Sequence, residues 1–265
     1  MGTIASEDLL KAILELGENG ETVIAARLAE FLKISSPAVS MALKRLQKKG
    51  YVRVSAKRSL ELTRQGFEAA TELVRRHRLV ERLLTDVLQM PWEMVHEEAE
   101  KLEHAISPEL EKRLLELFGK DGSCPHGNPF TPVLPARRTA RLLPLTDAPE
   151  NKPLRVVRIA ELHEKEKDFL NSLAALHLKP GSDLVLTRKT FDGILELRVG
   201  EKKTVFSSQS GSRIWVEVAW RASHRGTETR REGNQDGEVI KKERVLASLG
   251  MTSGMHALEK REEAG

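Results

Sequence analysis

Residues 35–63 read SSPAVSMALKRLQKKGYVRVSAKRSLELT, and this stretch decides the fold of the first part of the chain. Its opening serines can cap a helix and Pro37 suits a first helical turn, so we predict a helix that ends at Gly50. Two short alternating runs then surround a basic turn, which predicts a β-hairpin with strands 51–55 and 59–63. Two earlier helices are predicted from the spacing of apolar residues, at 5–17 and 22–33. Three short helices followed by a basic hairpin are typical of a winged helix-turn-helix domain.

The third predicted helix carries the residues that would meet DNA. The N-terminal residues of a recognition helix reach base edges in the major groove, and here these are Ser35, Ser36, Pro37, Ala38, Ser40 and Met41. None is an arginine or glutamine, so base-edge recognition should be modest. Phosphate contacts are expected from Lys44, Arg45, Lys48, Lys57 and Arg58. A winged helix used for protein contacts is the alternative.

Charge and composition limit the classes of protein. Hydrophobic residues make up 40% and charged residues 31% of the 265 residues, which indicates a globular protein. The single cysteine, Cys124, excludes a disulfide framework and suggests the cytoplasm. Residues 44–64 hold eight basic side chains and one acid, whereas residues 86–116 hold nine acids and three basic side chains. This contrast suggests one surface for a polyanion and another for cations, although two solvated helix faces would give the same pattern.

The chain after the winged domain is predicted to contain helices, then strands, then a tail. The helices have wide apolar faces and lie at about 66–89, 92–105 and 108–118. They predict dimerisation, with packing inside one chain as the alternative. The later pattern predicts a strand at 155–159, a helix at 166–176 and strands at 183–190, 193–199, 203–207 and 213–220. We therefore expect a mainly α fold with β additions: a winged helix-turn-helix domain at 1–64, a helical dimerisation and metal-binding domain at 65–145, a small barrel-like β-domain at 153–224, and a charged, mostly disordered tail at 225–265 with a weak helix near 238–249.

Imidazoles and carboxylates recur at helical spacing in the acidic part. The sequence HEEAEKLEH places four of them on one helix face: His96, Glu100, Glu103 and His104. His77 and Glu81 form a second pair four residues apart, and Asp8 lies on the first helix. Carboxylates with imidazoles favour manganese, ferrous iron or zinc, so these residues are candidate metal ligands. The alternative is a solvated acidic helix with incidental histidines.

No pattern indicates an enzyme. Residue 100 is a glutamate where a zinc protease motif starting at His96 requires a second histidine. Cys124 and His126 stand two residues apart in a proline-rich loop, which we interpret as a structural feature. We therefore predict no catalytic residues.

Several motifs together resemble the diphtheria toxin repressor family of metal-dependent regulators, over residues 4–225. The motifs are SPAVS at 36–40, RSL at 58–60, RHRLVERLL at 76–84, VHEEA at 95–99 with LEH at 102–104, and PHGNP at 125–129. The resemblance implies that the third domain is the SH3-like domain of the longer members. It also implies two metal sites: a switching site of Asp8, Glu100, Glu103 and His104, and a second site of His77, Glu81 and His96, with Glu166 reaching in from the third domain.

The resemblance makes this chain a hybrid of two types. Iron-type members have methionine and cysteine in place of Asp8 and Glu100, so the switching site is manganese-type. Lys11 stands where the compact manganese regulators have a further glutamate. His96 follows the iron-type layout, while Phe169 replaces an iron-type glutamine ligand. A preference for Mn2+ over Fe2+ is expected from the hard oxygen ligands.

The expected function is a cytoplasmic homodimeric repressor of metal homeostasis that binds a palindromic operator when two ions per subunit, Mn2+ or Fe2+, are bound. The ion at the switching site would join the first helix to the dimerisation domain and so hold two recognition helices about 34 Å apart. No membrane and no small organic substrate is expected as a partner. Two alternatives remain: a metal-independent winged-helix regulator with a small-molecule effector, and a metal-storage or metal-chaperone module.

Overall fold

The structure is a computed structural model that describes residues 6–56, 58–133, 142–160 and 166–219. The winged helix-turn-helix domain has the predicted order: α1 (Ser6–Glu18), α2 (Ala25–Phe31), α3 (Ser36–Lys48), β1 (Val52–Val54) and β2 (Leu60–Leu62). Ser35 caps α3, because its side chain accepts a hydrogen bond from the backbone N–H of Ala38. Helix α2 is shorter than predicted, since Ile24 precedes it and offers no capping side chain.

One apolar core holds the winged domain together. Leu9 and Leu14 of α1, Val39 and Leu46 of α3, and the wing residue Leu60 are all buried in it. Because α1 and α3 share this core, a force that orients α1 also orients the recognition helix.

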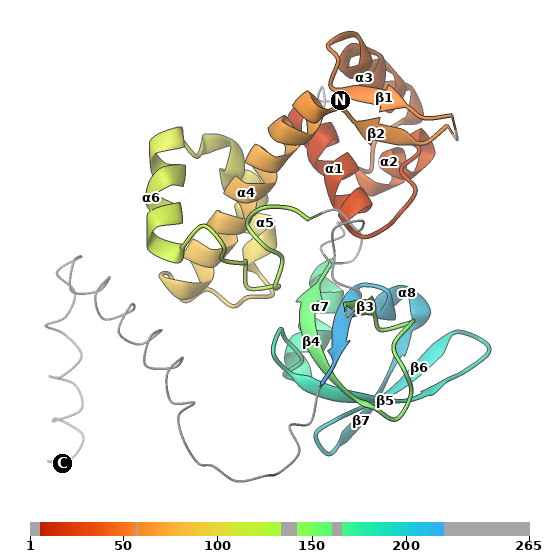
Figure 1. Ribbon diagram of the computed structural model, residues 1–265. Helices are drawn as coiled ribbons and strands as arrows, with labels where there is room; N and C mark the ends of the chain where they lie inside the picture. Colours follow the sequence, from red (N-terminus) through yellow and green to blue (C-terminus); the bar gives the residue numbers. More distant parts are fainter. Residues whose placement is uncertain (1–5, 57, 134–141, 161–165, 220–265) are drawn as a thin grey trace, which may run out of the picture. The chain divides into compact units, whose positions relative to one another are not determined.

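Helix α4 (Arg64–Asp86) connects the winged domain to the helical domain (Figure 1). Its first half contributes Ala70 and Val74 to the winged-domain core. Its second half packs Val80 and Leu84 against the following helix, and other residues against the helix after that. The following elements are α5 (Val95–Leu102), the 3-10 helix η1 (Glu103–Ala105) and α6 (Pro108–Phe118).

The helix predicted over 92–105 differs from the one found. Helix α5 begins only at Val95, and its α-helical geometry ends at Leu102. The next three residues form the tighter 3-10 turn η1, from Glu103 to Ala105. A 3-10 turn rotates each side chain by about 120° rather than 100°, so Glu103 and His104 leave the stripe expected for a continuous α-helix.

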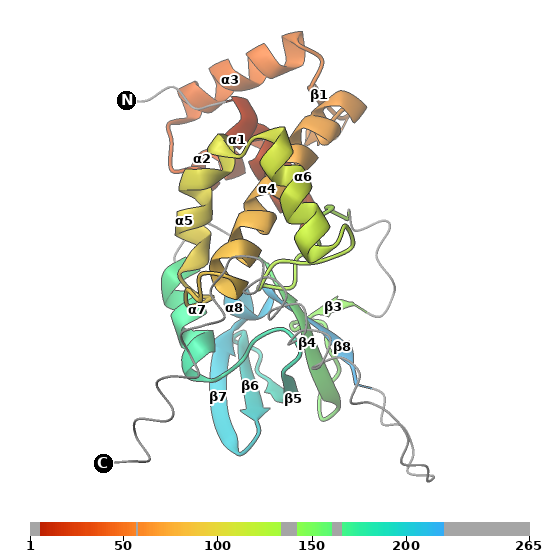
Figure 2. The ribbon, with the colours of Figure 1, turned by 90° about the vertical axis from the view of Figure 1, so that its left-hand side faces the viewer.

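The third domain is a six-stranded antiparallel sheet in the order β3-β8-β4-β5-β6-β7. Its elements are β3 (Leu143–Pro144), β4 (Pro153–Ile159), α7 (Glu166–Ala175), β5 (Asp183–Lys189), β6 (Ile194–Val199), β7 (Lys202–Ser207), α8 (Ser208–Gly211) and β8 (Ile214–Val218). The short elements β3 and α8 were not predicted, because a few residues give no readable periodicity. Helix α7 covers the sheet with Leu170 and Leu173 (Figure 2).

Some predictions fall outside the described residues. These are the disordered tail at 225–265, its weak helix near 238–249, and the wing residue Lys57. In the part of the chain that the structure does describe, no helix is both long and apolar enough to cross a membrane.

Candidate metal centre

Asp8, Glu103 and His104 come together where α1 meets η1. His104 Nε2 lies 2.9 Å from Asp8 Oδ1 and 3.7 Å from Glu103 Oε1. The other imidazole nitrogen, Nδ1, lies 3.1 Å from Glu7 Oε2. The side chain of His104 is 39% exposed and that of Asp8 36%, so this group is open to solvent. We call these three residues the exposed site.

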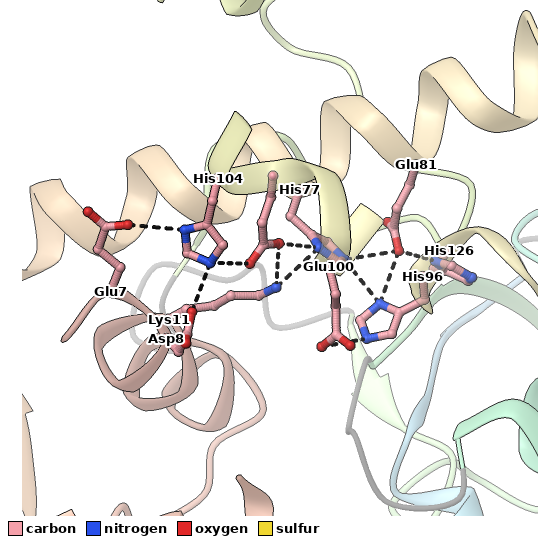
Figure 3. A network of polar contacts seen from close by, with 10 residues as sticks. Glu7, Asp8, Lys11, His77, Glu81, His96, Glu100, His104 and His126 are labelled. Atoms are coloured by element: carbon pink, nitrogen blue, oxygen red, sulfur yellow. Dashed lines mark hydrogen bonds and ion pairs between the residues drawn. The ribbon is translucent and has the colours of Figure 1, made fainter. Parts of the chain in front are cut away.

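A second cluster lies entirely in the interior, around Glu81 (Figure 3). Glu81 Oε1 lies 3.2 Å from both His77 Nε2 and His96 Nδ1. Those two imidazole nitrogens are 3.0 Å from each other. Three buried donor atoms that converge on one point in this way can act as ligands of one cation. We call the cluster around Glu81 the buried site.

The same glutamate oxygen also faces two residues from the loop after α6. His126 Nδ1 lies 3.3 Å from Glu81 Oε1, and Cys124 Sγ lies 3.9 Å from that imidazole nitrogen. Cys124 and His126 are buried, and with Glu81 they form a third group of candidate ligands. From their spacing alone we had predicted only a structural role for this pair. The buried site is therefore richer in nitrogen and sulfur than the spacing of residues on helices indicated.

The loop brings these two side chains together by turning tightly. The Gly127 backbone N–H donates to the carbonyl oxygen of Cys124, and Gly127 has a positive φ of 82°. A Cβ atom at Gly127 would lie 2.2 Å from the carbonyl oxygen of Val157, so only glycine fits. The sequence signal was the Cys-Pro-His-Gly order itself, which is compatible with a tight turn but does not show what the turn faces.

Lys11 lies between the exposed and buried sites. Its Nζ is 2.7 Å from Glu103 Oε2 and 3.1 Å from His77 Nδ1. The same Glu103 oxygen is 2.5 Å from His77 Nδ1. Glu103 thus presents one oxygen to His104 and the other to Lys11 and His77.

Local charges shift the pKa values of the central groups. Burial alone raises the pKa of Glu81, but the imidazoles of His126 and His77 outweigh it and hold this pKa well below its usual range. Burial likewise raises the pKa of Glu103, and the contacts with His77 and Lys11 lower it below the ordinary value. The pKa of His77 is raised, because Glu81 and Glu103 outweigh burial and the charge of Lys11. These carboxylates are therefore ionised and available as ligands at neutral pH.

Glu100 and Phe169 lie outside the exposed site, and the side chain of Glu166 is not described. Glu100 is not part of the exposed site; its Oε1 lies 3.6 Å from His96 Nε2, at the edge of the buried site. Glu166 is the first residue of α7, but its side chain is not among those described, so its role stays a prediction. Phe169 is buried in the third-domain core against Phe206.

The predicted DNA-contacting residues lie on the outer face of α3 and on the wing. Val39, Leu43 and Leu46 of α3 are buried, which leaves the opposite face to solvent. The exposed residues there are Ser36, Pro37, Ser40, Met41, Lys44, Arg45 and Lys48, with Ser35 at the cap, Ala38 half-buried and Arg58 at the wing.

Comparisons with known proteins match three successive parts of the chain to family models. Residues 3–60 match the model "Iron dependent repressor, N-terminal DNA binding domain", residues 63–132 match "Iron dependent repressor, metal binding and dimerisation domain", and residues 143–218 match "FeoA domain".

Two relatives and one solved structure show how far the similarity extends. The iron-dependent repressor IdeR of Mycobacterium leprae is 32% identical over 221 residues, covering 80% of this chain and 96% of that protein. The diphtheria toxin repressor of Corynebacterium diphtheriae is 36% identical over 199 residues, covering 72% of this chain and 87% of that protein. A manganese-dependent transcriptional repressor in complex with manganese superposes with a TM-score of 0.70 at 28% identity, covering 81% of this chain and 100% of that one.

Proposed function

The chain belongs to the diphtheria toxin repressor family of iron-dependent repressors, and on that premise we propose that it is a homodimeric repressor switched by Mn2+ or Fe2+. It acts on operator DNA in the cytoplasm and controls metal-ion homeostasis. We propose a regulator and assign no residue a catalytic role.

One observation carries the proposal: the exposed site joins the winged domain to the helical domain. Asp8 comes from α1, whereas Glu103 and His104 come from η1. A divalent cation held there would supply the positive charge that lets the two carboxylates face each other. Asp8 then fixes α1, and α1 fixes α3 through their shared core. Without that charge, repulsion between Asp8 and Glu103 lets the winged domain take other orientations, in which fewer dimers match the operator.

Two ions per subunit are proposed, one for each site. The exposed site uses Asp8, Glu103 and His104, and Glu100 is proposed to join it by a change of side-chain rotamer. The buried site uses His77, Glu81 and His96, with Cys124 and His126 as further ligands and Glu166 as a proposed ligand from α7. Carboxylate-rich ligand sets suit Mn2+, whereas imidazole and thiolate suit Fe2+ and Zn2+, so we propose that Mn2+ switches the protein through the exposed site.

Dimerisation is proposed through the helical domain. Large apolar side chains of this domain are exposed to solvent: Leu88, Met94, Leu102 and Leu110. Their burial against a second copy would remove apolar surface from water. A dimer presents two recognition helices in a symmetric pair, and this is why we propose a palindromic operator.

The test is operator binding by the full-length protein, titrated separately with Mn2+, Fe2+, Zn2+ and Co2+. The DNA probe is a duplex selected from a random library in the presence of Mn2+. We expect binding that requires metal and responds best to Mn2+. A metal-independent regulator would bind the probe equally well with a chelator present. A metal-storage module would bind the ions while no duplex is selected.

A further inference from the structure

Met41 is an exposed apolar side chain on α3, the helix that we expect to meet DNA. Its relative exposure is 63%, more than that of any other large apolar residue that the structure describes in the winged domain. Val39 of the same helix is buried, and Met41 lies about 160° from it around the helix axis. Met41 therefore points away from the core of its domain, and packing inside that domain does not explain why an apolar residue is present here.

The neighbours of Met41 on this face of α3 are mostly cations. Lys44, Arg45 and Lys48 lie within about 60° of Met41 around the helix, and all three are exposed. Three cations on one helix face suit the phosphates of a DNA backbone. Met41 carries no charge and no hydrogen-bond donor, so it gains nothing from a phosphate. Its partner in the contact area must be sought on the bases.

The major groove of B-DNA offers one kind of apolar group to such a side chain. Each base pair presents hydrogen-bond donors and acceptors there, and thymine adds its C5-methyl group. Met41 follows Ser36, the first residue of α3, by little more than one helical turn. This N-terminal part of a recognition helix is the part that approaches base edges. The unbranched and flexible methionine side chain can adapt its shape to a neighbouring methyl group and exclude water from it.

The other exposed residues in this part of α3 cannot make the same selection. Ser36 and Ser40 have short hydroxyl side chains, which donate or accept and so fit any base pair. Pro37 is apolar and exposed, but its ring is short and rigid. Met41 is the one long apolar side chain among them.

We propose that Met41 is a specificity-determining residue that selects a pyrimidine with a C5-methyl group, which is thymine in unmodified DNA, at one position of each operator half-site. This inference rests on the proposed function, because it names the chemical group that the recognition helix reads. A methyl contact gives α3 a sequence preference although its N-terminal part holds no arginine or glutamine.

The experiment measures Mn2+-dependent binding of the full-length protein to the duplex selected from the random library. Each thymine is replaced in turn by uracil, at the symmetric positions of both half-sites, which removes only the methyl group and keeps every hydrogen bond of the base pair. At one position we expect the affinity to fall about fourfold for each methyl group removed, as for the loss of one buried methyl or methylene group. Cytosine and 5-methylcytosine compared at that position should differ by the same factor.

The decisive variant is Met41→Ala. It should bind the thymine and uracil duplexes equally at that position, and the cytosine and 5-methylcytosine duplexes equally as well. Because Met41 is exposed and alanine favours helices, the variant should keep its fold. The matched control is Val205→Ala, which shortens an apolar side chain of the same relative exposure, 63%, on β7 of the third domain. This control should keep the full difference between thymine and uracil.

Two results would overturn the inference. One is an effect of uracil that is the same in the natural protein and in Met41→Ala at every position, and the other is a selected operator without thymine in its half-sites. The proposed function would fail in a different way: either no duplex would be selected at all, or binding would be the same with Mn2+ and with a chelator.

Discussion

At the scale of single residues, Glu103 and His104 are neighbours in sequence with opposite surroundings. Glu103 is buried and paired with Lys11, whereas His104 is substantially exposed. Changing either to alanine should abolish metal-activated DNA binding, because both belong to the exposed site. Only Glu103→Ala should also destabilise the fold, by about 3–5 kcal/mol, since it leaves the Lys11 ammonium buried without this partner. Operator binding and thermal unfolding of both variants check the two effects.

The control for these variants is Glu7→Ala. Glu7 contacts His104 Nδ1 at 3.1 Å but is not one of the three exposed-site residues. Its loss should leave metal activation intact. If His104→Ala still responded to metal as the natural protein does, the assignment of the exposed site would be wrong.

The shifted pKa values predict how the stability of the metal-free protein depends on pH. Glu81 and Glu103 have lowered pKa values, so their contribution is fully present above the ordinary value of 4.5 and is lost as pH falls through the folded-state values. His77 has a raised pKa, so its contribution is fully present below 6.5 and is lost as pH rises through its folded-state value. Unfolding in the presence of a chelator should therefore show greatest stability between about pH 4.5 and 6.5.

Metal should move this maximum. Ligand imidazoles bind ions only when deprotonated, so saturating Mn2+ should shift the greatest stability to higher pH. A stability profile that is the same with and without Mn2+ would contradict the use of His77 as a ligand.

The candidate ligands that were predictable are those whose proximity follows from helix spacing. His77 and Glu81 are four residues apart on α4, and residues four apart lie on the same face of any α-helix. Cys124 and His126 approach Glu81 only through the tertiary fold, which spacing does not reveal. The burial of Lys11 is equally a tertiary property, although a lysine where the compact manganese regulators have a glutamate was already visible in the sequence.

At the scale of elements, the break between α5 and η1 explains why Glu100 lies apart from the exposed site. In a continuous α-helix Glu100 and His104 would be about 40° apart on one face. The 3-10 turn at Glu103 carries His104 toward α1 and leaves Glu100 beside His96. Apolar periodicity predicted the existence of this helix but not its change of type, because the two helix types differ by less than a residue per turn.

Helix α3 supports a prediction about DNA. Lys44 and Arg45 are exposed beyond its first turn, where side chains reach phosphates rather than bases. Changing both to alanine should weaken binding to specific and random DNA alike and flatten the salt dependence by about one unit per lost phosphate contact. Binding measured over a range of salt concentrations checks this. The double change Lys112→Ala and Arg113→Ala, which removes two positive charges from exposed positions of α6, is the control. A variant of α3 that altered only sequence preference would show that these residues read bases.

The loop that contains Cys124 supports a prediction about the buried site. A thiolate ligand gives Co2+ an intense near-ultraviolet charge-transfer absorption, which oxygen and nitrogen ligands do not. The Co2+-loaded protein should show this band and Cys124→Ser should lose it, while Mn2+ binding at the exposed site persists. His126→Ala should weaken Co2+ binding roughly 10-fold or more through loss of a ligand. A band that survives in Cys124→Ser would exclude the sulfur as a ligand.

At the scale of the whole molecule, Arg158 connects elements from all three domains. This buried residue of β4 donates to Asn19 Oδ1, just after α1, at 2.6 Å and to Asn128 Oδ1 at 2.8 Å. Its guanidinium also lies 4.8 Å from the ring centroid of Trp215. The order of the three domains was predictable from periodicity and turn residues. This connection was not, because a single arginine in a strand gives no sign of its partners.

Arg158→Lys should show that the stabilisation by Arg158 depends on its planar hydrogen-bonding group and not only on its positive charge. Lysine keeps the positive charge but cannot reach both amides with a planar group, so we expect a loss of about 1–3 kcal/mol in the free energy of unfolding. Because one contact is at the end of α1, metal-activated DNA binding should also weaken. Thermal unfolding and operator titration measure these effects. Arg155→Lys on the same strand, whose exposed side chain pairs with Asp183, should change neither.

The difference in exposure between the two sites has a consequence for timing. Ions exchange quickly from ligands that water can reach and slowly from ligands sealed inside a core, because release from a core requires local opening of the fold. His104 and Asp8 are partly open to solvent, whereas His77 and Glu81 are fully buried. We therefore expect the repressor to leave DNA within the fast exchange time of the first ion while it still retains the second. If the metal concentration rises again soon afterwards, the protein still holds one of its two ions. The response of the repressor would then depend on recent metal concentrations as well as on the present one.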